Sequence, residues 1–85
     1  CKRDVGCHVA RLEVLGTLQD DVADEVLAAA VMAGPMNPDI RRWLARIAAR
    51  RGEREAALSH LRLLDRLGAL NSDDRALGQQ LTGSR

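Results

Sequence analysis

Apolar side chains recur along this chain after 34 residues, and this spacing limits the fold more than any other feature of the sequence. The pairs related by the step are Ala23 and Ala57, Leu27 and Leu61, Ala30 and Leu64, and Pro35 and Ala69. A period of roughly 20 to 50 residues is typical of proteins built from stacked supersecondary units. With 85 residues the chain holds two such units, which predicts one small domain.

The residues that fill this pattern favour helices. Apolar residues are 46% of the chain, with one Trp and no Phe or Tyr, so Ala, Leu and Val must form the core. Strands are usually rich in aromatic and β-branched side chains, whereas Ala and Leu favour helices. Between residues 40 and 48 the apolar positions recur every three or four residues, namely Ile40, Trp43, Leu44, Ile47 and Ala48. That spacing forms one stripe on an α-helix and places Trp43 in the core.

Glycines and caps divide the chain into about five helices. Gly34 is expected to close a helix in the left-handed conformation, Asn37 to cap the next one and Pro38 to occupy its first turn. Gly52 and Gly68 are expected to close the two helices that follow. The other expected boundaries are an end near Gln19, a cap at Asp20 or Asp21, and a start at Ser72 with Asp73 and Asp74.

The segment from Pro38 to Ala69 resembles the tetratricopeptide repeat. The matching positions are Leu44, Ala45, Ala48, Gly52, Ala57 and Leu61, where that family places its Leu-Gly pair, a bulky residue, a turn Gly, a small Ala and an aromatic. The resemblance implies an all-α fold of antiparallel helical hairpins, a fragment of an α-solenoid. It divides the domain into a degenerate repeat over residues 1–35, a second repeat over 36–70 and a terminal helix over 71–85.

Charge is distributed unevenly along the chain, although the net charge is only +1. The stretch Asp4–Asp39 holds seven acids and one arginine, −6, whereas Arg41–Arg66 holds eight arginines and three acids, +5. Small net charge provides no overall attraction to nucleic acid or to a membrane. The split between the halves would suit head-to-tail self-association.

In the repeat family the first helix of each hairpin lines a concave groove, and here that face carries the candidate site. Its residues are Asp39, Arg42, Arg46, Ala49 and Arg50. Arginine holds a carboxylate with two parallel hydrogen bonds, so this face predicts an acidic peptide or helix as ligand. The alternative is a solvated face whose arginines pair with the acids of the chain itself, which are Asp20, Asp21, Asp24 and Glu25.

These features predict a non-enzymatic protein-binding module, a scaffold or chaperone-like adaptor for an acidic or amphipathic segment. The Arg- and Ala-rich composition suggests a bacterial source, where the partner could belong to a secretion apparatus. The alternative is a helix-turn-helix regulator, because Ser59–Leu70 resembles the recognition helix of the arsenical-repressor type. The following NSDDRALGQQ has no β-branched or aromatic residues for the wing of that fold, which weighs against DNA as the partner.

Catalytic and metal-binding patterns are absent from the sequence. Cys1, Cys7, His8 and His60 lack the spacing of a zinc or haem site, so we expect no metal, cofactor or enzymatic activity. Cys7 would be a small core residue, or the partner of Cys1 in a disulfide of an exported protein, and His60 a partly exposed helix residue. No apolar run is long enough to span a membrane. The expected location is the cytoplasm, and the alternative is a periplasmic lipoprotein with Cys1 as its processed first residue.

Overall fold

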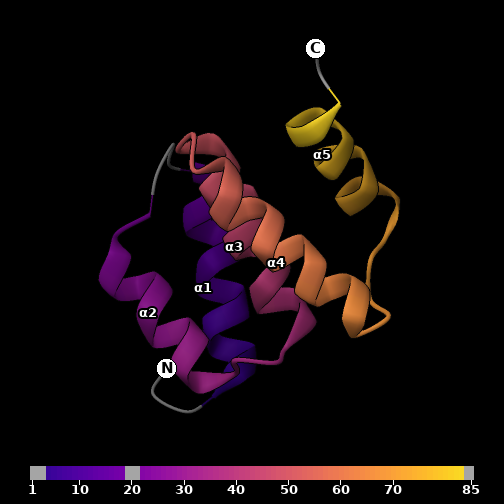
Figure 1. Cartoon of the computed structure of the whole chain (residues 1–85). Helices are drawn as coiled ribbons and strands as arrows, with labels where there is room; N and C mark the ends of the chain where they lie inside the picture. Colours follow the sequence, from indigo (N-terminus) through magenta and orange to yellow (C-terminus); the bar gives the residue numbers. More distant parts are fainter. Residues whose placement is uncertain (1–3, 19–21, 84–85) are drawn as a thin grey trace.

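The computed structural model describes residues 4–18 and 22–83, and these residues form five helices (Figure 1). The helices are α1 (Val5–Leu18), α2 (Asp24–Ala33), α3 (Pro38–Arg50), α4 (Arg54–Arg66) and α5 (Ser72–Thr82). Within this described part no strand is present, which confirms the predicted all-α class. No helix among these residues has the length and apolar character needed to cross a bilayer.

The side chain of Asn37 explains where α3 begins, and two glycines explain where α3 and α4 end. The side chain of Asn37 accepts hydrogen bonds from the backbone N–H groups of Asp39 and Ile40, as its position predicted. Gly52 and Gly68 have positive φ angles of 78° and 70°, which L side chains rarely adopt, so these glycines turn the chain at both helix ends.

Two of the expected helix ends differ from the structure. Gly34 was expected in the left-handed conformation, but its φ angle is −150° and its ψ angle 75°, which lies outside the left-handed region. Helix α2 has Ala23 as its N-cap, without a side-chain hydrogen bond, and Asp20 and Asp21 lie outside the described residues. By contrast, helix α5 begins at Ser72, as predicted, and the side chain of Asn71 caps it.

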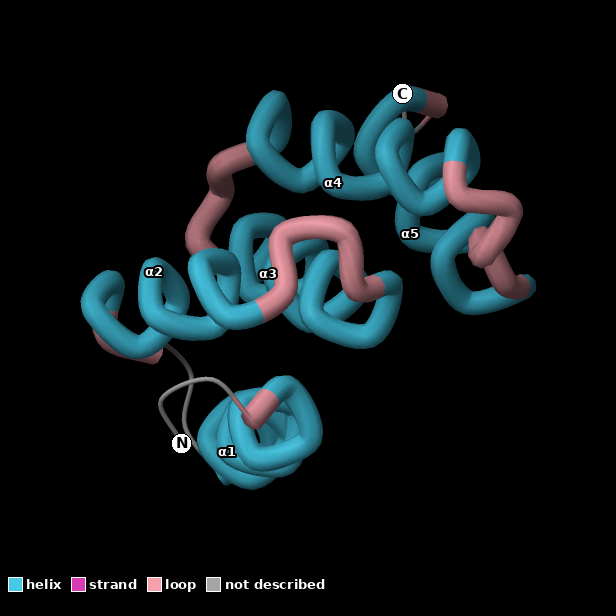
Figure 2. Tube along the Cα trace, turned by 90° about the horizontal axis from the view of Figure 1, so that it is seen from below, coloured by secondary structure: helices cyan, strands magenta, loops and turns pink. Residues whose placement is uncertain are grey.

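Helix α3 is the centre of the arrangement, because it contacts all four other helices. Figures 1 and 2 show α1 on one side of α3 and α4 on the other. The remaining contacts join α1 to α2 and α4 to α5, whereas α2 and α4 have no Cα atoms within 8 Å of each other. Helices α1, α2 and α3 thus contact one another, as do α3, α4 and α5, although the contact between α3 and α4 is far more extensive than that between α1 and α2.

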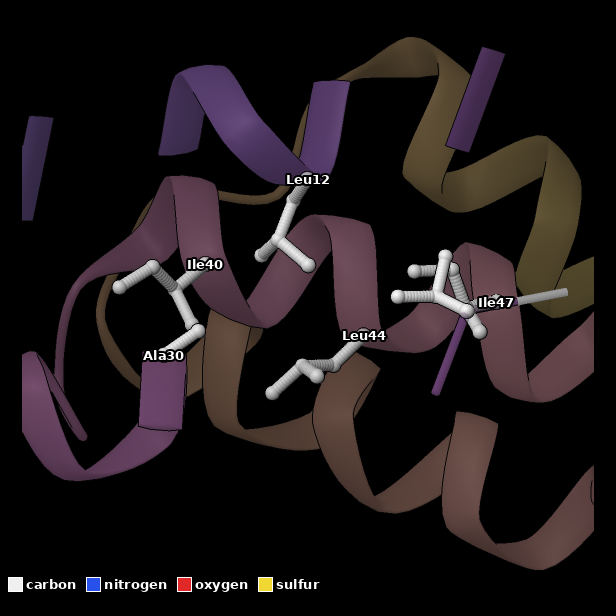
Figure 3. Packing of buried hydrophobic residues seen from close by; sticks show 6 residues of the cluster. Leu12, Ala30, Ile40, Leu44 and Ile47 are labelled. Carbon is white, nitrogen blue, oxygen red and sulfur yellow. The ribbon is translucent and has the colours of Figure 1, made fainter. Parts of the chain in front are cut away.

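Two apolar clusters hold these layers together. The first joins α1, α2 and α3, and Figure 3 shows how its side chains converge on α3; its members include Leu12, Ala30, Ile40, Leu44 and Ile47. The second joins α3, α4 and α5 through Ala45, Leu61 and Leu64. Each buried leucine or isoleucine stabilises the fold by roughly 1.5–3 kcal/mol. Ala45 and Ala57 are fully buried, and α3 and α4 form the most extensive contact of the molecule.

Candidate functional site

Arg42, the first arginine of the predicted binding face, is used inside the fold. Its Nε donates to Oδ2 of Asp74 at 2.9 Å, and its Nη2 donates to the carbonyl oxygen of Ala69 at 2.6 Å. Its Nη1 donates to Oδ1 of Asp39 at 3.1 Å. The Arg42 side chain is 17% exposed and that of Asp74 only 1%, so this pair is a buried link from α3 to α5.

The rest of the predicted face also contacts the chain itself. Arg50 donates from Nη1 to the carbonyl oxygen of Gly16 in α1. The guanidinium of Arg46 lies 5.2 Å from the ring centre of Trp43, which is cation–π distance. Ala49 is half-buried. Partner binding by this face stays a prediction, but two of its three guanidinium groups already donate to backbone or carboxylate oxygens of the fold.

The two neighbouring arginines are engaged as well. Arg41 donates from Nε to the carbonyl oxygen of Pro35 at 2.7 Å, and its Nη1 lies 3.3 Å from Nδ1 of His60. Arg51 forms an ion pair with Asp24 at 2.7 Å. Asp24 of the acidic front half is thus paired with Arg51, which is not one of the three arginines of the predicted site. Asp20 and Asp21, also considered as partners, lie outside the described residues.

A groove of about 420 Å³ runs between α4 and α5, and we call it the α4–α5 seam. Its lining residues are Leu58, Leu61, Arg62, Asp65, Leu70, Asp74, Arg75, Gly78, Gln79 and Thr82. The leucines form an apolar floor, with charged and polar side chains on both walls. An apolar depression with a few polar groups around it is the usual character of a binding site.

Gly78 leaves the floor of the seam open. A Cβ atom at this position would lie 3.7 Å from Cδ1 of Leu61, an ordinary van der Waals distance, so a side chain there would occupy the groove without a backbone clash. Glycine in a helix interior costs roughly 1 kcal/mol relative to alanine. Helix α5 thus contains a residue that weakens the helix and widens the seam.

Arg62 and Arg75 give the two walls of the seam free positive charge. Arg62 projects from α4 and Arg75 from α5, both are exposed, and neither guanidinium has a hydrogen bond or ion pair to any residue of 4–18 and 22–83. The buried acid of the seam, Asp74, is already bound by Arg42 and by the backbone N–H of Asn71. The only other carboxylate among the lining residues is the exposed Asp65.

The 34-residue period relates the α4–α5 seam to a second groove. This groove lies between α2 and α3, is lined by Leu27, Ala28, Val31 and Leu44, and is called the α2–α3 seam. Adding 34 to the residue numbers takes Leu27 of α2 to Leu61 and Leu44 of α3 to Gly78, so the α2–α3 seam corresponds to the α4–α5 seam. At the α2–α3 seam the remaining hollow is about 200 Å³, and α4 lines it with Ala56 and His60. No helix in the described part of the chain occupies the equivalent place beside α4 and α5.

The two seams differ in polarity at two equivalent positions. Ala28 and Val31 line the α2–α3 seam, and the equivalent positions of the α4–α5 seam are Arg62 and Asp65. The α2–α3 seam is therefore apolar on the α2 side, whereas the α4–α5 seam carries charged side chains that remain in contact with water. A ligand of the uncovered seam must combine an apolar surface with groups that match these charges.

The histidine and cysteine side chains of the described residues form no metal-binding group. Among the described residues, no three His, Cys, Asp or Glu side chains are close enough to hold a metal ion. Cys7 is disulfide-bonded, and the other cysteine of the sequence, Cys1, lies outside the described residues. His60 is half-buried, as its position predicted; burial first, and then the charge of Arg41, lowers its pKa below the usual value.

Comparisons with protein-family models, with curated proteins and with solved structures found no match to this chain. A function for this chain is therefore inferred from the geometry of the α4–α5 seam. Arg62, Arg75 and Gly78 of the seam all lie outside the face predicted from the sequence. The isolated Gly78 within the helical pattern of α5 was the available signal, since a glycine inside a helix costs roughly 1 kcal/mol relative to alanine.

Proposed function

We propose that this chain is a non-enzymatic protein-binding module, a scaffold or adaptor of the helical-repeat kind related to tetratricopeptide repeats. Its ligand would be an acidic or amphipathic segment of another protein. The recurrence of the same helix contacts after one hairpin supports the repeat interpretation. Repeats of this type bind through the surfaces that their stacking leaves open.

The uncovered α4–α5 seam is the single observation that carries this proposal. It combines an apolar floor, where Leu58 and Leu70 are partly exposed, with two arginines that the fold does not use. Folded proteins leave exposed arginines in many places, but here they flank a depression whose counterpart on α2 and α3 is lined by another helix. The binding surface is therefore moved from the predicted face of α3 to the seam between α4 and α5.

A DNA-binding role receives less support from the fold. The regulator interpretation requires a β-ribbon after Leu70, and that part of the chain forms α5 instead. Helix α4, which would be the recognition helix, is packed between α3 and α5 with Ala57, Leu61 and Leu64 buried. A gel shift with duplex DNA of mixed sequence at low salt should show no tight binding, and tight binding would favour the regulator.

Selection from a displayed library of random peptides tests the proposal directly. The intact protein is immobilised and the bound peptides are recovered, then titrated into ¹⁵N-labelled protein. We expect enriched peptides to shift amide signals of α4 and α5, including Gly78. Replacing Gly78 with leucine should abolish their binding because the new side chain would fill the seam, while the circular dichroism spectrum stays helical.

The control is Arg54→Glu together with Arg66→Glu, which changes two exposed cations of α4 that do not line the seam. This variant should bind the recovered peptides as the native chain does. The proposal fails if no peptide is enriched above the level seen with an unrelated helical protein. It also fails if the recovered peptides bind the Gly78→Leu variant unchanged.

A further inference from the structure

We infer that the ligand of the α4–α5 seam is a single amphipathic helix of a partner protein, with a carboxylate side chain held between Arg62 and Arg75. This inference rests on the proposed function and specifies its ligand. It names three features of the ligand: helical conformation, aliphatic side chains on one face, and an Asp or Glu beside them. Each feature follows from a separate observation on the seam.

The internal repeat indicates that the ligand is a helix. Helix α4 packs on α3 and lines the α2–α3 seam with Ala56 and His60, which lie four residues apart on one helical face. Because the 34-residue step takes α2 and α3 onto α4 and α5, the helix equivalent to α4 would lie in the α4–α5 seam. Helix α5 has 11 residues, so the seam is about 16 Å long and matches three turns of a helix.

The floor of the seam requires aliphatic side chains. Leu58, Leu61 and Leu70 form it, and Leu61 is 6% exposed without a ligand. Gly78 provides no side chain above Leu61, where the corresponding Leu44 fills the α2–α3 seam. A leucine or isoleucine of the ligand can take the place that Leu44 has in the first seam. The space for it is available because the cavity is about 420 Å³ there, against about 200 Å³ in the first seam.

The walls of the seam require a carboxylate. Arg62 and Arg75 stand on opposite walls and have no acidic partner within residues 4–18 and 22–83. A guanidinium binds a carboxylate through two parallel hydrogen bonds, and two such groups favour one acid placed between them. On the predicted face of α3, Arg42 and Arg50 already donate to oxygens of the fold, and Arg46 lies over the ring of Trp43.

A focused peptide library tests the charge requirement. Its members are amphipathic peptides of about 16 residues with leucines at alternating spacings of three and four, long enough to span the seam. The positions that flank the leucines are randomised among Glu, Gln and Lys. Selection on the native protein should enrich Glu at one of these positions, and selection on the Arg62→Gln/Arg75→Gln variant should enrich none.

Affinities measured by fluorescence anisotropy make the test quantitative. Replacing the enriched Glu with Gln should weaken binding about tenfold, the loss expected for a charge-assisted hydrogen bond at a partly exposed site. Arg62→Gln should weaken binding of the Glu peptide by a similar factor and leave the Gln peptide nearly unchanged. The matched Arg54→Gln and Arg66→Gln variants, on the same helix but away from the seam, should bind both peptides as the native chain does.

The outcomes separate this inference from the proposed function. If selected peptides lose binding to Gly78→Leu but show no preference for Glu, the carboxylate inference is wrong while the binding module stands. If no member of either library binds, both are wrong. If light scattering shows a dimer that Gly78→Leu converts to a monomer, a second copy of the chain occupies the seam and a partner helix is excluded.

Discussion

The ion pair between Arg42 and Asp74 gives the sharpest prediction about stability. Arg42→Ala removes three hydrogen bonds, to Asp74, Asp39 and the carbonyl of Ala69. The side chain of Asp74 is only 1% exposed. After the substitution its carboxylate keeps the hydrogen bond from the backbone N–H of Asn71 but has lost the guanidinium. Removing one partner of a buried pair costs about 3–5 kcal/mol.

Because the Arg42 side chain keeps 17% exposure, the lower end of that range applies, about 3 kcal/mol. A domain of 85 residues is stable by about 4–13 kcal/mol, so the loss is a large part of the total. Urea unfolding followed by circular dichroism should show a midpoint lowered by about 2 M. Amide hydrogen exchange in α5 should accelerate most, since this pair is a main connection of α5 to α3.

Two further variants identify the cause. Adding Asp74→Asn to Arg42→Ala removes the unpaired charge and should recover roughly 1 kcal/mol, because the amide oxygen still accepts from Asn71. Arg46→Ala, which removes a guanidinium from the surface of Trp43, should cost less than about 1 kcal/mol. An Arg42→Ala protein within about 0.5 kcal/mol of the native chain, with unchanged exchange in α5, would refute the reasoning.

Three other changes have defined outcomes. Asn37→Ala should destabilise the protein by about 1 kcal/mol in urea unfolding because two N–H groups of α3 lose their acceptor, and Asn37→Asp should not. Gly16→Ala places a Cβ 2.7 Å from the Trp43 ring, so we expect a loss of about 1–3 kcal/mol and an altered Trp fluorescence spectrum; an unchanged spectrum would contradict the close contact. His60 has a lowered pKa in the fold, so below its ordinary pKa of about 6.5 the unfolded chain binds more protons and stability falls as the pH falls. His60→Gln, which keeps an acceptor for Arg41, should lose that part of the pH dependence.

Much of the fold was predictable because local chemistry determines it. Asn37 and Pro38 have the side chain and the ring that a helix start requires, and Gly52 and Gly68 provide the positive φ angles that end a helix. Gly34 shows the limit of such reasoning. A glycine after a helix can close it in more than one conformation, and the choice depends on the direction in which the next helix leaves.

The candidate site was less predictable, since a charge pattern does not tell which charged side chains form hydrogen bonds or ion pairs within the fold. Arg42, Arg46 and Arg50 follow one helical face, but Arg42 reaches α5 and Arg50 reaches α1 through contacts set by tertiary packing, whereas Arg46 lies over Trp43 of the same helix. Arg62 and Arg75 lie on consecutive helices and line one groove because α5 packs beside α4. Their shared groove becomes visible only when the helices are placed in space.

Nuclear Overhauser effects between the protein and a selected Glu-containing peptide test the uncovered seam most directly. If the ligand is an amphipathic helix in this seam, the leucine methyl groups of the peptide should show cross-peaks to the methyl groups of Leu61 and Leu70 and to the α protons of Gly78. Cross-peaks to Leu27 and Val31 instead, or a bound peptide without the sequential amide contacts of a helix, would contradict it.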